Sequence, residues 1–285
     1  MQEPLTRKAG NQVEWFVTLP WQNIYETYER ITKHLMEHIE VAGFRKGKAP
    51  ADMAKKHIDD AKVYEEVLKE LIPKVYADSV KAHNLKPILS PKVEVIEADK
   101  EKPWKFKIVT AEKPPITLGN YRQAISKMKS AKKSPVIVPG KENQKQEEIT
   151  LADVLDALAA EIKVELPDIL VEQEVTRMLS NLVDQTQKLG LTVEQYLQSQ
   201  GKTSDALREE YKNDAQKTLS LEFALEEIAD KESITIDNKD IDGFINQAKT
   251  EEDKKALTAQ RYYIANLLRR QKTVAALLES PIVTS

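Results

Sequence analysis

A proline pair followed by a long polar stretch divides this chain, and the division limits the folds open to it. Pro114 and Pro115 stand together, and paired prolines neither continue a strand nor begin a helix in mid-run. From Lys127 to Glu148 the chain is rich in Lys, Ser, Gln and Pro, which is typical of a flexible linker. The 285 residues are enough for more than one domain. We predict a domain over 1–113, a connector and flexible linker over 114–149, and a second domain over 150–285.

The first part of the chain mixes alternating and helical patterns. Alternation over Val13–Leu19 predicts a strand, and two alternating runs, Val93–Val95 and Trp104–Ile108, predict a hairpin. Apolar residues spaced by three and four predict helices between them, over Trp21 to about Val41, Pro50 to about His57, and Ala61 to His83. Pro73 is expected to kink or split the last of these. Strand, helices and hairpin together predict a small α+β domain.

The second part carries helical periodicity and helix-end signals. Thr150 and Asp153 resemble a capping box, and Pro167 and Gly190 suit the start and end of a helix. Helices are expected over Thr150 to Ile162, Pro167 to Gly190, Thr192 to Gln200, Ser204 to Lys231, Asp237 to about Ala248, and across Leu257 to Leu277. Their unequal lengths argue against a solenoid. The predicted fold class is an α+β domain followed by an extended all-α domain, mostly helical overall, with 116–126 as an ordered connector.

Charge is distributed unevenly along the chain. The net charge of −3 combines +2 over residues 1–115, +4 over 116–150 and −9 over 151–285. The first half can approach RNA, whereas the acidic second half should be repelled from it. This distribution argues against a uniform nucleic-acid binder.

Several kinds of chemistry are not expected from this sequence. There are no cysteines, which excludes disulfides and thiolate metal sites. The polar N-terminus and the lack of a long apolar run indicate a cytoplasmic protein with no membrane contact. Neither a glycine-rich phosphate loop nor a nucleophile elbow is present, so we expect no ATP use, no cofactor and no catalytic residue.

The most distinctive local motif is a basic run bracketed by glycines. Gly43 and Gly47 allow tight turns, which would push Phe44, Arg45 and Lys46 outward at a loop tip. An exposed phenylalanine beside cations suits an apolar crevice flanked by phosphates or carboxylates. The alternative is an ordinary basic loop between two helices, with Phe44 folded back into the core. The whole run reads Gly43-Phe44-Arg45-Lys46-Gly47-Lys48-Ala49-Pro50.

This run resembles the ribosome-docking signature of trigger factor, a family of bacterial nascent-chain chaperones, and it lies between two helices as it does there. A second set of segments is similar to the family's C-terminal domain, whose body and two arms cradle unfolded chains. These segments are Leu189–Leu197, Gly201–Thr203, Leu207–Arg208 and Leu225–Ala229. The resemblance covers 1–125 and 150–278, although the C-terminal helix looks shorter than usual.

The resemblance implies an ATP-independent chaperone that docks at the exit tunnel of the large ribosomal subunit. Phe44 would enter an apolar notch, while Arg45 and Lys46 pair with acidic side chains or rRNA phosphates. Lys48 would add charge, Gly43 and Gly47 would set the shape of the loop, and Pro50, which ends the run, belongs to the same ribosome-binding set. Family members can also form homodimers when off the ribosome. Surplus apolar residues of the second domain are expected to contact unfolded clients; the candidates are Met178, Tyr262, Tyr263 and Leu278.

One departure from the family concerns the linker. Most members carry a prolyl-isomerase domain of the FK506-binding type at about this position. The roughly 20 residues of the linker cannot build a sheet wrapped on a helix with an aromatic-lined pocket. We therefore expect that the isomerase domain and its activity are absent.

Two other functions are weighed against the chaperone. His34 and His38 lie four apart on a predicted helix, a spacing that can chelate a metal, but solvated or structural histidines are the simpler interpretation and no metal is expected. One alternative is an enzyme, either a degenerate isomerase or a metal hydrolase that uses His34 and His38. A ribosome-independent periplasmic chaperone resembling SurA is the other alternative, and the lack of a signal peptide argues against it.

Overall fold

The computed structural model describes residues 4–133 and 148–281, and its contacts divide the chain into two units. The first unit contains Met1–Pro114 and Pro167–Leu170, and the second contains Pro115–Leu166 and Val171–Ser285. Each unit is described by itself. Within the described ranges, no helix is both long enough and apolar enough to cross a membrane.

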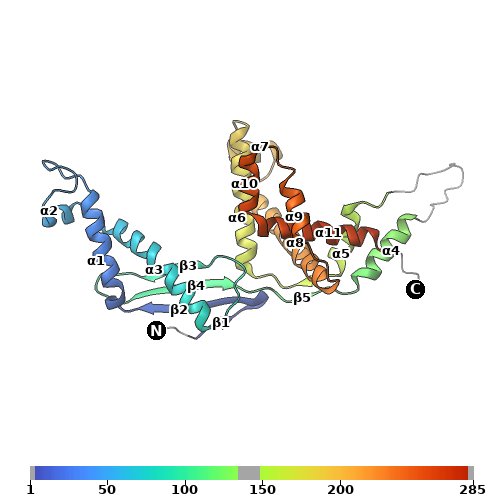
Figure 1. Cartoon of the computed structure of the whole chain (residues 1–285), viewed down its shortest axis with the longest axis horizontal. Coiled ribbons are helices and arrows are strands. Elements are labelled where there is room, and N and C mark those ends of the chain that lie inside the picture. The colour runs from blue at the N-terminus through green and yellow to red at the C-terminus, as the bar shows by residue number, and fades with distance from the viewer. Residues whose placement is uncertain (1–3, 134–147, 282–285) are drawn as a thin grey trace. The chain divides into compact units, whose positions relative to one another are not determined.

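The first unit is built on an antiparallel sheet (Figure 1). β2 (Gln12–Leu19) pairs with β4 (Trp104–Ala111) along its full length, and β4 also pairs with β3 (Lys92–Glu97). The predicted strand and hairpin are thus confirmed. The two-residue strand β1 (Thr6–Arg7) completes the order β1-β2-β4-β3 and was not predicted, because so short a run has no readable alternation.

Three helices accompany this sheet, and the core lies under two of them. They are α1 (Trp21–His38), α2 (Ala51–Lys56) and α3 (Asp60–Ala82). Trp104 and Phe106 of the sheet pack with buried residues of α1 and α3, including Ile24 and Val63. The predicted split of the third helix does not occur, and α3 continues through Pro73. Core packing of Leu71 and Val75, on either side of the proline, offsets the lost hydrogen bond.

A short distant segment covers part of the sheet. Ile169 packs against Val109 and Ala111 of β4, together with the partly buried Leu89. Its backbone N–H donates to the side-chain oxygen of Gln12 at 3.1 Å. The chain therefore returns to the first unit after residue 166, a contact that the periodicity of the sequence does not indicate.

The second unit is helical except for two strands of two residues each. Its elements are β5 (Ile116–Thr117), α4 (Tyr121–Lys133), α5 (Leu151–Glu161), β6 (Lys163–Val164), α6 (Asp168–Lys188, whose first residues belong to the first unit), α7 (Val193–Gln200), α8 (Ser204–Lys231), α9 (Asn238–Ile245), α10 (Glu251–Ala259) and α11 (Arg261–Glu279). The fold class predicted from the sequence, an α+β part followed by a helical part, is confirmed.

Two predictions within this unit were wrong in detail. Residues 127–133, predicted as linker, form the second half of α4, because the helical spacing of apolar residues continues through Met128. Within the remainder of the predicted linker, residues 134–147 lie outside the described residues, and Ile149 packs against the main core of this unit. The predicted last helix is two helices, α10 and α11, which meet at Gln260.

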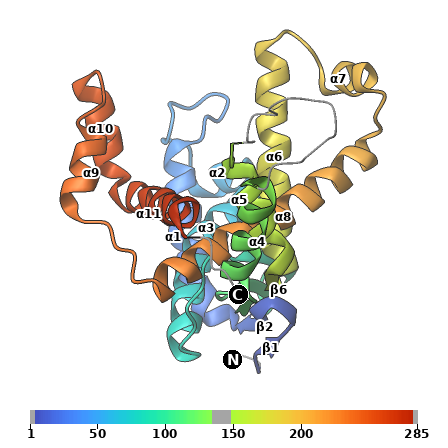
Figure 2. The same ribbon diagram turned by 90° about the vertical axis from the view of Figure 1, so that its right-hand side faces the viewer.

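The main core of the second unit collects residues that are far apart in sequence. Leu118, Tyr121 and Ile125 precede the predicted linker, whereas the remaining buried members follow it. Those are Val154, Leu158, Ala224, Leu225, Ile228 and Leu277. Two smaller clusters lie elsewhere, one joining α6, α7 and α8 around Leu182, the other joining α9 and α11 around Ile264. In Figure 2, α6 with α7 and α9 with α10 form two projections of this unit.

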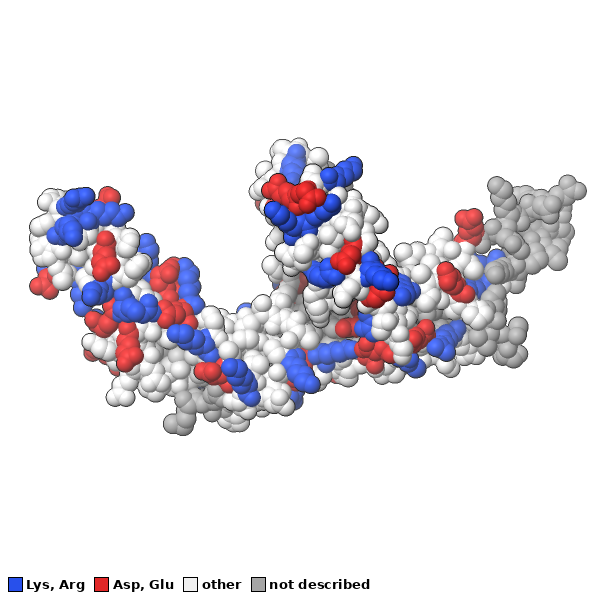
Figure 3. Space-filling view, in the orientation of Figure 1, with Lys and Arg blue, Asp and Glu red and all other residues white. Residues whose placement is uncertain are grey.

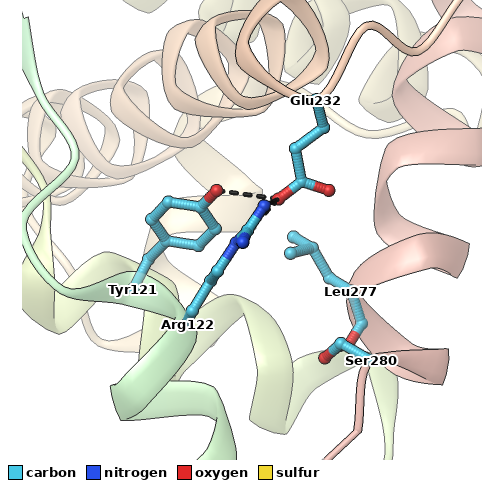
Figure 4. Close-up of polar contacts among 5 residues, drawn as sticks. All are labelled: Tyr121, Arg122, Glu232, Leu277 and Ser280. Atoms are coloured by element: carbon cyan, nitrogen blue, oxygen red, sulfur yellow. Dashed lines mark hydrogen bonds and ion pairs between the residues drawn. The ribbon is translucent and has the colours of Figure 1, made fainter.

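Polar and cationic side chains of α4 form hydrogen bonds with other parts of this unit. Tyr121 and Arg122 both donate to one carboxylate oxygen of Glu232, at 2.8 and 3.0 Å, as Figure 4 shows. Burial, followed by this hydrogen bond, raises the pKa of Tyr121. The Nζ of Lys129 is buried and donates to the backbone oxygens of Leu277 (2.8 Å) and Ser280 (2.6 Å) at the end of α11. Cations are favoured at a helix C-terminus, where backbone carbonyls lack helical partners.

Candidate functional site

The basic run forms a loop between α1 and α2 that contains two successive turns. The N–H of Phe44 donates to the oxygen of Val41 at 3.0 Å, and the N–H of Lys48 donates to the oxygen of Arg45 at 2.8 Å. Gly43 and Gly47 occupy the third position of these turns, with φ of +86° and +70°. Positive φ at that position is the arrangement of a type II turn, which favours glycine. The sequence therefore sets the shape of this loop locally.

The two glycines differ in their surroundings. A Cβ atom on Gly47 would lie 2.3 Å from the backbone oxygen of Glu37, whereas one on Gly43 would meet nothing within 4 Å. The N–H of Gly47 also donates to the oxygen of Ile39 at 3.3 Å. The second turn is therefore held against the end of α1, while the first turn projects freely.

Phe44 lies at the free turn and is 41% exposed. The alternative in which its ring folds back into the core does not describe this structure. Arg45, Lys46 and Lys48 are exposed, and none forms an ion pair or side-chain hydrogen bond with any residue that the structure describes. Figure 3 shows Lys and Arg gathered around the end of the first unit that carries this loop and α2. The loop thus presents an aromatic ring beside three cations that have no partner in the described part of the chain.

The base of the loop is anchored, and α2 enlarges its surface. Val41 and Ala54 are buried, which fixes the chain on both sides of the tip. Pro50 precedes α2 as its N-cap rather than lying in its first turn. Met53, Lys55 and Lys56 are exposed on α2, and the sequence analysis did not single them out. The lysine pair that follows the motif after four residues was the signal that could have found the last two.

The predicted client-contacting residues are not brought together as one group. Tyr262 and Tyr263 lie on the first turn of α11 and are 83% and 59% exposed. Met178 is half-buried on α6, and Leu278 packs against the main core of the second unit. The sequence analysis did not name three other exposed apolar residues as client contacts: Val183 on α6, and Leu189 and Leu191 in the turn from α6 to α7. The two leucines flank Gly190, where the helix ends, and this was the available signal.

The histidine pair lies on the last turn of α1. Both rings are exposed, and their centroids are 4.6 Å apart. Across residues 4–133 and 148–281, no group of three or more His, Cys, Asp or Glu residues is placed to hold a metal ion.

Comparisons with known proteins agree on one family. The family model of the bacterial trigger factor protein matches residues 1–149, and the model of its C-terminus matches residues 138–279. The trigger factor of Lactiplantibacillus plantarum is 29% identical over 117 residues, or 41% of this chain and 27% of that protein. The trigger factor of Pelotomaculum thermopropionicum is 30% identical over 123 residues, or 43% of this chain and 28% of that protein.

A solved structure shares the fold. It belongs to work on promiscuous substrate recognition in folding and assembly activities of the trigger factor chaperone, and it is similar with a TM-score of 0.63 at 13% identity. The similarity covers 98% of this chain and 100% of that one. The aligned segments span little more than a quarter of the two relatives above. Because the first family model alone covers more than half of the residues, the chain belongs to the trigger factor family.

Proposed function

We propose that this chain is an ATP-independent cytoplasmic chaperone that docks on the large ribosomal subunit at the exit tunnel and shields unfolded nascent chains. Family membership and the likeness to a chaperone structure support the general class. The observation that carries the docking proposal is the exposed Phe44 beside Arg45, Lys46 and Lys48, none of which has a partner among the described residues.

Docking would combine apolar burial with charge pairing. Fully burying an exposed phenylalanine side chain contributes roughly 1.5–3 kcal/mol, and Phe44, which is 41% exposed before docking, would add a part of that. Arg45 and Lys46 would donate charge-assisted hydrogen bonds to carboxylates of an exit-tunnel protein or to rRNA phosphates. The two glycine turns hold the tip in shape before it binds, which lowers the entropy lost on association.

Client binding would use scattered apolar side chains rather than one pocket. Tyr262 and Tyr263 on α11, and Leu189 and Leu191 after α6, are exposed, whereas Met178 and Leu278 are partly buried. Weak contacts of this kind suit a client that must later leave and fold. We expect Met178 and Leu278 to contribute less than the two tyrosines.

The proposed function does not include prolyl isomerisation. The two matched family regions overlap at residues 138–149, which leaves no stretch between them for a third domain. A proline-isomerisation assay with a peptide substrate checks this, and a rate above the uncatalysed one that scales with protein concentration would contradict it.

Two triple variants separate docking from client binding. Phe44→Ala/Arg45→Ala/Lys46→Ala should abolish co-sedimentation with ribosomes while leaving helicity unchanged. The matched control, Lys249→Ala/Lys255→Ala/Tyr262→Ala, removes one exposed aromatic ring and two exposed lysines from the second unit. It should co-sediment normally but suppress the aggregation of an unfolded protein less well. Normal co-sedimentation of the loop variant would overturn the docking proposal.

A further inference from the structure

The histidine pair at the end of α1 has features beyond its spacing. Residues four apart on a helix lie on one face, and the rings of His34 and His38 are 4.6 Å apart. Two imidazole nitrogens bound to one zinc ion lie about 3.4 Å from each other, given Zn–N bonds of about 2.0–2.1 Å in tetrahedral geometry. Small rotations of two exposed side chains are enough to reach that separation.

A hydrogen bond prepares one of the rings for a metal. The Nδ1 of His38 lies 2.9 Å from the backbone oxygen of His34. A carbonyl oxygen can only accept, so Nδ1 carries the proton and the lone pair of the neutral ring is on Nε2. A backbone carbonyl that orients the far side of the ring is the usual support for a metal-binding histidine.

We propose that His34 and His38 form a two-histidine site for a divalent transition-metal ion that favours imidazole, such as Zn²⁺, with water completing the coordination. The pair is exposed, so an ion can reach it, and such ions bind imidazole more strongly than Mg²⁺ or Ca²⁺ do. With only two protein ligands, the site binds exchangeably rather than as a closed structural centre. The proposal does not rest on ribosome docking.

Because the proposed site lies on the last turn of α1, a bound ion would also affect the basic loop that follows. An ion bound between His34 and His38 closes the last turn of α1. The next residue, Ile39, accepts the hydrogen bond from the N–H of Gly47, and Gly47 also lies against the backbone of Glu37. Bound metal therefore stabilises the end of the helix on which the second loop turn rests.

Zinc titration of the untagged full chain tests the site directly. Isothermal titration calorimetry with ZnCl₂ should show one saturable site per chain. His34→Ala and His38→Ala should each weaken it on the order of 100-fold, because the second imidazole binds as an intramolecular partner. His57→Ala, which removes an exposed histidine outside the pair, should leave it unchanged.

A register control and an exchange measurement complete the test. Lys33→His/His38→Ala keeps the number of histidines but places them at adjacent positions, which do not face each other, so binding should stay weak. At zinc concentrations about 100 times the Kd, local opening of the last turn of α1 is suppressed about 100-fold. Exchange of the Gly47 amide should slow by up to that factor, because its hydrogen-bond acceptor, Ile39, directly follows that turn. Absence of saturable binding, or binding that survives either single alanine, would overturn the site. Unchanged Gly47 exchange in the zinc-bound protein would overturn its coupling to the loop.

Discussion

Cationic side chains differ in their partners between the basic loop of the first unit and the surroundings of α4 in the second. At the tip of the first unit, Arg45, Lys46 and Lys48 face solvent without a partner among the described residues. In the second unit, Arg122 pairs with Glu232, and Lys129 is 2% exposed with its charge on the carbonyl oxygens that end α11. The cations of the loop thus keep their hydrogen-bond donors available among the described residues, whereas Arg122 and Lys129 already donate to partners within the protein.

This difference distinguishes cations that are available to bind a ligand from cations that stabilise the fold. A cation that is already satisfied gains little from an external partner, whereas an unpaired one keeps its hydrogen-bonding capacity for a ligand. The presence of basic residues therefore says less about function than whether they have partners. Four predictions test this contrast.

The largest effect is expected at Lys129. Replacing it with methionine keeps most of the side-chain volume but leaves buried backbone oxygens without a donor, so the free energy of unfolding should fall by about 3 kcal/mol. Lys127→Met, two residues away and exposed, should change it by less than about 0.5 kcal/mol. Chemical denaturation of both variants measures this. Equal effects would mean that burial does not distinguish the two lysines.

Added salt should lower ribosome affinity much more than it lowers the free energy of unfolding. If Arg45, Lys46 and Lys48 all contact phosphates, ribosome affinity should fall roughly 10- to 50-fold between 50 and 200 mM salt. Co-sedimentation across that range measures it. The free energy of unfolding, to which the buried Lys129 contributes, should change little because buried contacts are screened less. Ribosome affinity that is independent of salt would show that the loop cations do not contribute.

The two loop glycines should respond unequally to alanine. Both have positive φ, which costs an L-residue about 1–2 kcal/mol. Gly47→Ala adds a clash with the backbone oxygen of Glu37, so it should reduce ribosome affinity about tenfold more than Gly43→Ala does. Quantitative co-sedimentation of the two variants compares them. A stronger effect at Gly43 would indicate that the free turn, and not the anchored one, sets the loop shape.

The smallest effect concerns a partly buried ion pair at the start of α5, between Lys132 and Asp153. The hydrogen bond from Lys132, followed by those from Thr150, lowers the pKa of Asp153 to about 2. Because the folded-state pKa lies below the ordinary value of 3.8, the stabilisation is fully present above about pH 4 and is lost as pH falls towards 2. Asp153→Asn should therefore be less stable than the wild type near pH 5, with a difference that shrinks below pH 4. Thermal unfolding across this range measures it, and Lys132→Met should show the same trend. Parallel profiles for wild type and variants would contradict the assignment.

Local features of this chain could be predicted from sequence because their causes are local. Positive φ at Gly43 and Gly47 follows from the residue type, and the capping box of Thr150 with Asp153 is present as the motif indicates. Phe44 is exposed between these two turns, as the positions of the glycines predict. The roles of the loop and the tyrosines remain predictions.

Long-range packing could not be predicted, because it depends on residues that meet only in the fold. The lysines of α4 hid its helical pattern, since a buried Lys129 is indistinguishable in sequence from a solvated one. The group that makes burial of Lys129 possible, the end of α11, lies about 150 residues away in the sequence. The break at Gln260 has no proline or glycine to mark it. For the same reason Leu278, a plausible client contact by composition, packs against the core instead.

The return of Ile169 to the first unit affects how the protein is made. During synthesis, the face of β4 around Val109 and Ala111 is complete long before the residue that covers it exists. At about 5–20 residues per second, the intervening chain after Pro114 takes several seconds to emerge. Throughout that delay a newly made copy exposes an apolar strip on its first sheet, the kind of surface that a nascent-chain chaperone holds.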